Sequence, residues 1–161
     1  MIIHVDIDMT LVDIARCFEV AKAVQPRIPT YDWDVRYYPG AIADIIQWLD
    51  EGREEHVIEG AFEALDAMIA AGHVVWITTA RTERAMERFR EKYPKYAALV
   101  RSKKDVVASK ERCDVLIDDY PMAEHAMLAG IVYIIERDYN ASVMPGFPRA
   151  SSLQDATRAI L

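Results

Sequence analysis

Two aspartates separated by one residue follow the first apolar run of the chain. The sequence begins MIIHVDIDMT, so Asp6 and Asp8 come directly after residues that are typical of a short buried strand. Side chains two residues apart point to the same face of an extended strand, so both carboxylates can converge on one point at the end of this strand. Two anions held this close require a cation, a shared proton or another compensating contact. The pair therefore indicates a site for chemistry at the end of this strand.

Polar residues also follow three later predicted strands. In a parallel α/β sheet the carboxyl ends of the strands meet at one edge, and ligands bind there. We therefore expect these residues to gather near the first aspartate pair. They supply hydroxyls, basic groups and a second carboxylate pair: Thr78, Thr79, Arg81, Lys103, Lys104, Asp118 and Asp119.

This set of side chains favours a magnesium-assisted transfer of a phosphoryl group to a carboxylate. Mg²⁺ prefers oxygen ligands, and it binds through one or two carboxylates together with waters and a phosphate oxygen. An aspartate can attack phosphorus, while a second carboxylate protonates the leaving oxygen and later deprotonates water. A hydroxyl and an ammonium stabilise the charge on the transferred group. Each segment alone has a structural explanation, so the prediction depends on their order and their positions after strands.

Strands and helices are predicted to alternate from residue 57 onward. Helices are expected over 57–71, 82–93, 121–130 and 151–161, and strands over 73–79, 97–100, 114–118 and 131–135. This alternation predicts an α/β fold with a Rossmann-like parallel sheet and helices on both faces. The intervening segment 15–56 is rich in aromatic residues and prolines, and is expected to form a small helical cap inserted after the first strand. The core domain would then comprise residues 1–14 and 57–161.

The composition restricts the partners of the chain. Its 161 residues carry a formal net charge of −7, and 52% of them are hydrophobic. A nucleic-acid polymer is disfavoured because its binding requires clustered Lys and Arg, whereas a small phosphorylated substrate is compatible with this charge. There is no leader-like segment and no apolar run near the roughly 18 residues of a membrane span. Cys17 and Cys113 have no metal-binding spacing, so we expect a reduced, cytoplasmic protein, and the sequence leaves open whether it forms a homodimer.

The four polar segments resemble the motifs of the haloacid-dehalogenase (HAD) superfamily of phosphohydrolases. "DIDMT" looks like its DxDx[T/V] signature, and "WITT", "KK" and "LIDD" look like its second, third and fourth motifs. Residues 15–56 stand in the place of the first cap of that superfamily. The stretches "KKDVVASKERCDVLIDDYP" and "RDYN", with the spacing of "DMTLVD", are most similar to the 5′(3′)-deoxyribonucleotidase group. The resemblance implies a HAD-like fold, a Mg²⁺ cofactor and a nucleoside 5′-monophosphate, especially a deoxy form, as substrate.

The resemblance also implies roles for the four aspartates. Asp6 would be the nucleophile and a metal ligand. Asp8 would be the general acid and base, with its backbone carbonyl on the metal. Asp118 and Asp119 would complete the metal site, and the resemblance does not decide which of them touches the ion directly.

Neighbouring residues are distinguished by their places in the motifs. The hydroxyl of the second motif precedes a small residue and an arginine in the "TAR" turn, which selects Thr79 over Thr78. The "K-x-V-V" spacing selects Lys104 over Lys103 as the catalytic lysine. The predicted substrate-binding residues are Met9, Thr10, Thr79, Arg81 and Lys104.

Two features depart from the nucleotidase group. Met9 stands where that group usually has glycine, and glycine tolerates backbone angles that methionine resists. Ile14 stands where that group has an aromatic residue that stacks on the base. Aromatic residues of the predicted cap could replace it, or else pack within the cap: Phe18, Tyr31, Trp33, Tyr37 and Tyr38. Alternative functions are a phosphatase of nucleic-acid ends or sugar phosphates, and a non-catalytic phosphoacceptor or binding module. A signalling receiver domain carries similar residues, but the DxDxT order disfavours it.

Overall fold

The computed structural model describes residues 1–15, 47, 50–51, 56–137, 139–141 and 144–161. Within these ranges six strands form one sheet, and each strand pairs with its neighbours in parallel. In spatial order they are β5 (Val100–Ser102), β4 (Val74–Thr79), β1 (Ile2–Asp6), β6 (Cys113–Asp118), β7 (Ala129–Ile135) and β8 (Arg149–Ala150). The predicted Rossmann-like parallel sheet is therefore confirmed.

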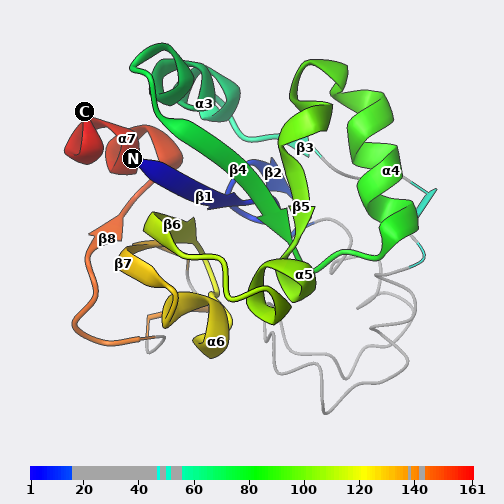
Figure 1. Ribbon diagram of the computed structural model, residues 1–161. Coiled ribbons are helices and arrows are strands. Elements are labelled where there is room, and N and C mark those ends of the chain that lie inside the picture. The colour runs from blue at the N-terminus through cyan, green and yellow to red at the C-terminus, as the bar shows by residue number, and fades with distance from the viewer. Residues whose placement is uncertain (16–46, 48–49, 52–55, 138, 142–143) are drawn as a thin grey trace.

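Helices lie on both faces of the sheet (Figure 1). α3 (Ala61–Ala70), α4 (Glu83–Lys92) and α7 (Leu153–Ile160) contribute buried side chains to the larger hydrophobic core on one face. α5 (Lys103–Ala108) and α6 (Ala123–Ala126) belong to the other face, where α6 contributes to a smaller core. Strands covered on both faces need apolar side chains at nearly every position, which explains the continuous apolar runs of β1 and β6.

The link between α4 and β5 differs from the prediction. Thr82 is the N-cap of α4, and its hydroxyl oxygen accepts a hydrogen bond from the backbone N–H of Ala85 at 3.2 Å. After α4 the 3₁₀ helix η2 (Pro94–Leu99) occupies most of the segment predicted as a strand, and the strand begins only at Val100. The ring of Tyr96 stacks on Phe62 of α3 with centroids 4.6 Å apart, so packing against α3 favours the 3₁₀ turn.

The last two predicted helices also differ in their bounds. α6 is only four residues long, because Ala129 and Gly130 already belong to β7. The N-cap of α7 is Ser152, whose hydroxyl accepts a hydrogen bond from the backbone N–H of Asp155 at 3.2 Å. The helix therefore begins at Leu153, two residues after the predicted start at residue 151.

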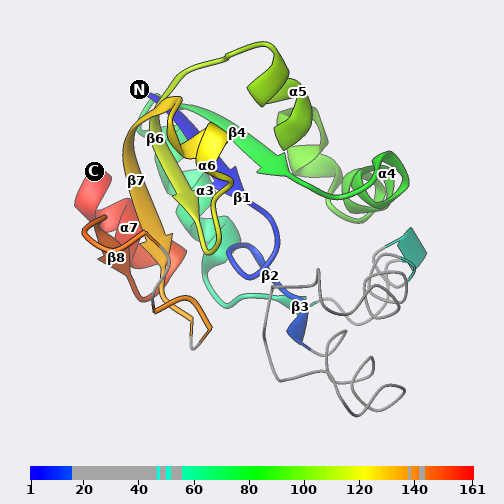
Figure 2. The ribbon, with the colours of Figure 1, turned by 90° about the horizontal axis from the view of Figure 1, so that it is seen from below.

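Two short strands join the ends of the predicted cap segment. β2 (Val12–Asp13) and β3 (His56–Val57) pair antiparallel, with Val12 opposite Val57. Figure 2 shows this pair beyond the carboxyl end of β1, so the chain departs and returns next to the edge of the sheet where ligands bind. Most of the cap segment, with its aromatic residues, lies outside the described residues, so the cap boundaries stay a prediction.

Among the described helices, none combines the length and the apolar character that a membrane span requires.

Candidate active site

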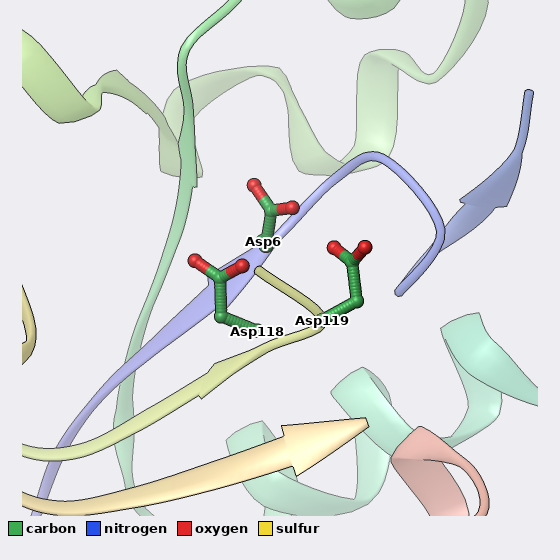
Figure 3. Close-up of side chains that lie close together, drawn as sticks. All are labelled: Asp6, Asp118 and Asp119. Carbon is green, nitrogen blue, oxygen red and sulfur yellow. The ribbon is translucent and has the colours of Figure 1, made fainter. Parts of the chain in front are cut away.

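Three carboxylates meet beyond the carboxyl ends of two adjacent strands. Asp6 is the last residue of β1, Asp118 is the last residue of β6, and Asp119 follows it. Ligand oxygens of the three side chains all lie within 4.8 Å of one another, and all three residues are buried (Figure 3). Buried carboxylates at this spacing require a cation or protons, and hard oxygen donors suit Mg²⁺. The structure thus brings together three of the four aspartates that the sequence selects.

Lys103 provides a positive charge inside this cluster. Its Nζ lies 2.8 Å from Oδ1 of Asp6 and 2.6 Å from Oδ2 of Asp118, and the residue is 4% exposed. Burial disfavours the charged ammonium, but the carboxylates of Asp118 and Asp6 outweigh this effect and raise the pKa of Lys103 above its ordinary value. The lysine is therefore charged at neutral pH and links the nucleophile predicted on β1 to the aspartate pair on β6.

The structure brings Lys103 to the carboxylates, and not Lys104, which the sequence predicts as the catalytic lysine. Lys104 is exposed, whereas Lys103 reaches the carboxylates from the first turn of α5. Buried Val106 lies three residues after Lys103, so both side chains face the interior on one side of the helix. Lys104 falls on the neighbouring, solvent-facing side. Lys103 has valines at both i+3 and i+4, which is the only signal in the sequence that favours it.

The two aspartates after β6 differ in their hydrogen bonds. Both carboxylate oxygens of Asp118 have partners, because Oδ2 accepts from Lys103 and Oδ1 accepts from the backbone N–H of Tyr120 at 2.9 Å. Asp119 accepts a hydrogen bond at Oδ2 from the hydroxyl of Tyr139. Its Oδ1 has no protein partner among the described residues. Asp119 is therefore better placed than Asp118 to offer an oxygen to a metal ion.

The titration of the carboxylates reflects their crowding. Burial raises the pKa of Asp119 to about 7, with a further contribution from the charge of Asp118, while the Tyr139 hydroxyl and Lys103 act in the opposite direction. Burial and the charge of Asp118 also hold the pKa of Asp6 well above its usual range, against the opposing charge of Lys103. Without a metal ion, the carboxylates of Asp119 and Asp6 therefore bind protons more readily near neutral pH than ordinary aspartates do.

Two residues of the segment after β7 form hydrogen bonds with Asp119. Asn140 is fully buried, and its Nδ2 donates to the backbone carbonyl oxygens of Asp119 and Ile135, each at 2.7 Å. Tyr139 holds the carboxylate of the same aspartate. Sequence reasoning noticed "RDYN" only as a resemblance and assigned no site residue there. The buried asparagine next to a tyrosine was the available signal.

Asp8 lies outside the three-carboxylate cluster and is bound by Arg81. Nε and Nη2 of Arg81 donate to Oδ1 of Asp8 at 3.0 Å and 2.6 Å, and Nε also approaches Oδ2 at 3.3 Å. The side chain of Arg81 is 1% exposed and that of Asp8 is 15% exposed. The arginine that the sequence assigned to the substrate is thus in contact with the predicted acid and base.

The turn after Asp8 and the end of β4 supply the remaining predicted residues. Met9 adopts φ 58°, the left-handed region that its glycine counterpart would tolerate more readily. Its N–H donates to the carbonyl of Val12 at 2.7 Å, and its own carbonyl accepts from the guanidinium of Arg137. Thr79 is buried, and its hydroxyl oxygen accepts from the backbone N–H of Arg81 at 3.1 Å. Thr10 is also buried, and its hydroxyl has no hydrogen-bond partner among the described residues.

Two histidines contact each other in the interior of the protein. His4 of β1 and His125 of α6 are fully buried, with Nδ1 of the first 3.0 Å from Nε2 of the second. Burial, with the charge of Lys103, lowers the pKa of His125 to about 3, and burial also lowers the pKa of His4. Both rings are therefore neutral at physiological pH.

The architecture that holds this site is shared with solved hydrolases. A haloacid-dehalogenase-like family hydrolase from Xanthomonas campestris matches with a TM-score of 0.63 and 15% identity, over 99% of this chain and 94% of that one. Phosphoserine phosphatase from T. onnurineus matches with a TM-score of 0.59 and 14% identity, over 99% and 93%. CbbY from Rhodobacter sphaeroides, solved with phosphate, matches with a TM-score of 0.59 and 12% identity, over 96% and 95%. The chain has the HAD-like fold.

At these identities the comparisons show the HAD-like fold and leave the substrate open. No family model matches the sequence, and no curated protein matches it significantly. The structural matches nevertheless support the resemblance to HAD hydrolases that the motifs predict, because they share the fold. The finer resemblance to the deoxyribonucleotidase group stays a prediction from the motifs.

Proposed function

We propose that the protein is a Mg²⁺-dependent phosphatase that hydrolyses a small phosphomonoester through an aspartyl-phosphate on Asp6. The observation that carries the proposal is the buried set of Asp6, Asp118, Asp119 and Lys103 beyond the carboxyl ends of β1 and β6. Carboxylates that serve only the fold are rarely buried at this density, because their mutual repulsion costs stability. A site that must bind a cation and then a phosphate dianion explains this arrangement.

The donors present fit a magnesium ion. Asp6 and Asp119 would be its carboxylate ligands, because both oxygens of Asp118 already have protein partners. The backbone carbonyl of Asp8 would be a third protein ligand, as the motif resemblance implies. When bound, Mg²⁺ would neutralise charge and polarise a phosphoryl oxygen of the substrate.

The residues of the chain then account for both chemical steps. The carboxylate of Asp6 attacks phosphorus, the bond from phosphorus to the ester oxygen breaks, and Asp8 supplies a proton to the leaving oxygen. Asp8 next takes a proton from a water molecule, which attacks the aspartyl-phosphate, so that inorganic phosphate leaves and Asp6 is regenerated. Lys103 holds Asp6 in place and, with the hydroxyl of Thr79, offers donors to the transferred group.

A nucleoside 5′-monophosphate, especially a deoxy form, is the first substrate that we propose. Its support is the similarity of the third and fourth motifs, and of "RDYN", to the deoxyribonucleotidase group, together with a net charge of −7 that suits a small substrate rather than a polymer. A second candidate is a phosphorylated amino acid or sugar. It is favoured by the structural similarity to the phosphoserine phosphatase of T. onnurineus.

Phosphate release from a panel of esters tests the proposal. The panel contains deoxy- and ribonucleoside 5′- and 3′-monophosphates, phosphoserine, sugar phosphates and p-nitrophenyl phosphate, each with Mg²⁺ and with EDTA. We expect Mg²⁺-dependent release that is fastest with a nucleoside 5′-monophosphate. Faster release from phosphoserine or a sugar phosphate would move the substrate to the second candidate. No release from any ester with Mg²⁺ present would contradict the phosphatase function.

A further inference from the structure

We infer that Arg81 is a positioning residue that holds the carboxylate of Asp8 for proton transfer, and that it does not bind the phosphate of the substrate. The inference rests on the proposed function, in which Asp8 exchanges protons with the leaving oxygen and with water. Sequence reasoning had placed Arg81 among the substrate-binding residues. The structure gives its guanidinium a different partner.

The contact between the two side chains has the fork geometry that is specific to arginine. Nη2 and Nε of Arg81 lie 2.6 Å and 3.0 Å from Oδ1 of Asp8, and Nε lies 3.3 Å from Oδ2. Two parallel donors fix both the position and the plane of a carboxylate, which a single ammonium cannot do. Asp8 stands in a turn after β1, where its side chain would otherwise be free to sample several rotamers.

The other side of Arg81 is anchored in the core. Its guanidinium carbon lies 5.7 Å from the centre of the Phe89 ring, and Phe89 is fully buried in α4. Its backbone N–H is bound to the hydroxyl oxygen of Thr79 at 3.1 Å. The guanidinium is thus held between the carboxylate of Asp8 and the ring of Phe89. These contacts fix the side chain of Arg81, which in turn holds the carboxylate of Asp8 in place.

This role has a kinetic signature that depends on the leaving group. A poorly acidic alcohol must receive a proton as its bond to phosphorus breaks, whereas p-nitrophenolate leaves without one. Loss of a residue that aims Asp8 should therefore slow alkyl esters far more than p-nitrophenyl phosphate. Loss of a phosphate-binding residue should instead raise KM for both classes of ester by the same factor.

The kinetic test uses Arg81→Met, Asp8→Asn and the double variant, each with p-nitrophenyl phosphate and the best alkyl ester of the panel. We expect Arg81→Met to lower kcat/KM for the alkyl ester at least about tenfold more than for p-nitrophenyl phosphate, because kcat/KM reports the release of the leaving group and not the later attack of water that both esters share. The double variant should be no slower than Asp8→Asn, because both changes remove one function. Arg81→Lys should recover part of the loss. Equal losses for the two esters with a raised KM, or multiplicative losses in the double variant, would overturn the inference.

A thermodynamic test needs no activity. Urea unfolding of the same three variants forms a double-mutant cycle, and we expect the unfolding constants to show coupling of at least about fivefold between Arg81 and Asp8. Arg84→Met, which removes an exposed arginine in the first turn of α4, serves as the control and should show no coupling with Asp8→Asn. Absence of coupling would contradict the inference about Arg81 and would not affect the proposed function. A wild-type protein that hydrolyses no ester but shows the coupling would contradict the proposed function and retain the contact between Arg81 and Asp8.

Discussion

Replacement of Lys103 by methionine removes the positive charge that joins Asp6 to Asp118. Because the ammonium lies 2.8 Å and 2.6 Å from these carboxylates and is 4% exposed, its loss leaves two buried anions in contact without a cation. Removal of one member of a buried ion pair costs about 3–5 kcal/mol. For a chain of 161 residues this corresponds to a fall of roughly 10 °C in Tm.

The loss of stability should also depend on pH. A proton on one of the two carboxylates can replace the missing charge, and the pKa of Asp6 is already raised by burial and by Asp118. The cost of Lys103→Met should therefore shrink by up to about 1.4 kcal/mol for each unit by which the pH is lowered from about 8. The variant and the wild type would approach each other in stability toward about pH 5.

Thermal unfolding in EDTA, followed by circular dichroism at several pH values, measures this effect. Lys104→Met is the matched control, because it removes an identical side chain that is exposed one position later. We expect the control to change Tm by less than about 2 °C. A control that loses more stability than Lys103→Met, or a Lys103→Met variant with unchanged Tm at about pH 8, would refute the electrostatic account of the cluster.

Two further predictions concern the metal ligands. Burial raises the pKa of Asp119 to about 7, so between about pH 4 and 7 the folded protein binds a proton that the unfolded chain has lost, and stability in EDTA should fall as the pH rises through this window. Since Mg²⁺ requires the deprotonated carboxylate, the rise in Tm that it causes should be larger at about pH 8 than at about pH 6, and an equal rise at both would contradict this. Tyr139→Phe deletes the hydroxyl on Asp119 and should weaken Mg²⁺ binding about tenfold by calorimetry, with Tyr120→Phe, an exposed tyrosine beside the aspartate pair, as the control. Unchanged Mg²⁺ affinity in Tyr139→Phe would show that the hydroxyl does not orient the ligand.

The sheet and the cluster of aspartates could be predicted from the sequence because both follow from strand order. A buried parallel strand is mostly apolar and ends in polar residues, so Asp6 and Asp118 could be predicted to lie at the ends of two strands. The edge of the sheet then brings these ends together, since β1 and β6 are adjacent.

The contacts between side chains were harder to predict from the sequence. Lys103 and Lys104 have nearly the same surroundings in the sequence, and the rotation of one short helix decides which of them faces the carboxylates. The pair of Arg81 and Asp8 joins residues 73 positions apart. Motif reasoning had assigned Arg81 to the substrate and Asp8 to proton transfer and the metal, and had not paired the two. Such pairings depend on side-chain directions that the order of motifs does not specify.

The support of Asp119 was missed for a related reason. Tyr139 and Asn140 follow β7 in an irregular segment, where hydrophobic periodicity does not predict which side chains point inward. The strand β8, with only two residues, was missed because it is too short to show a pattern.

Detection of the covalent intermediate tests the central claim most directly. Wild-type protein mixed with substrate and Mg²⁺ would be quenched in acid during turnover and digested with trypsin, and the peptide that covers residues 1–16 would be analysed by mass spectrometry. We predict that this peptide gains the mass of one phosphoryl group, located on Asp6, and that Asp6→Asn neither gains it nor releases phosphate. Turnover by Asp6→Asn at the wild-type rate, or a phosphoryl group on another residue, would contradict the account.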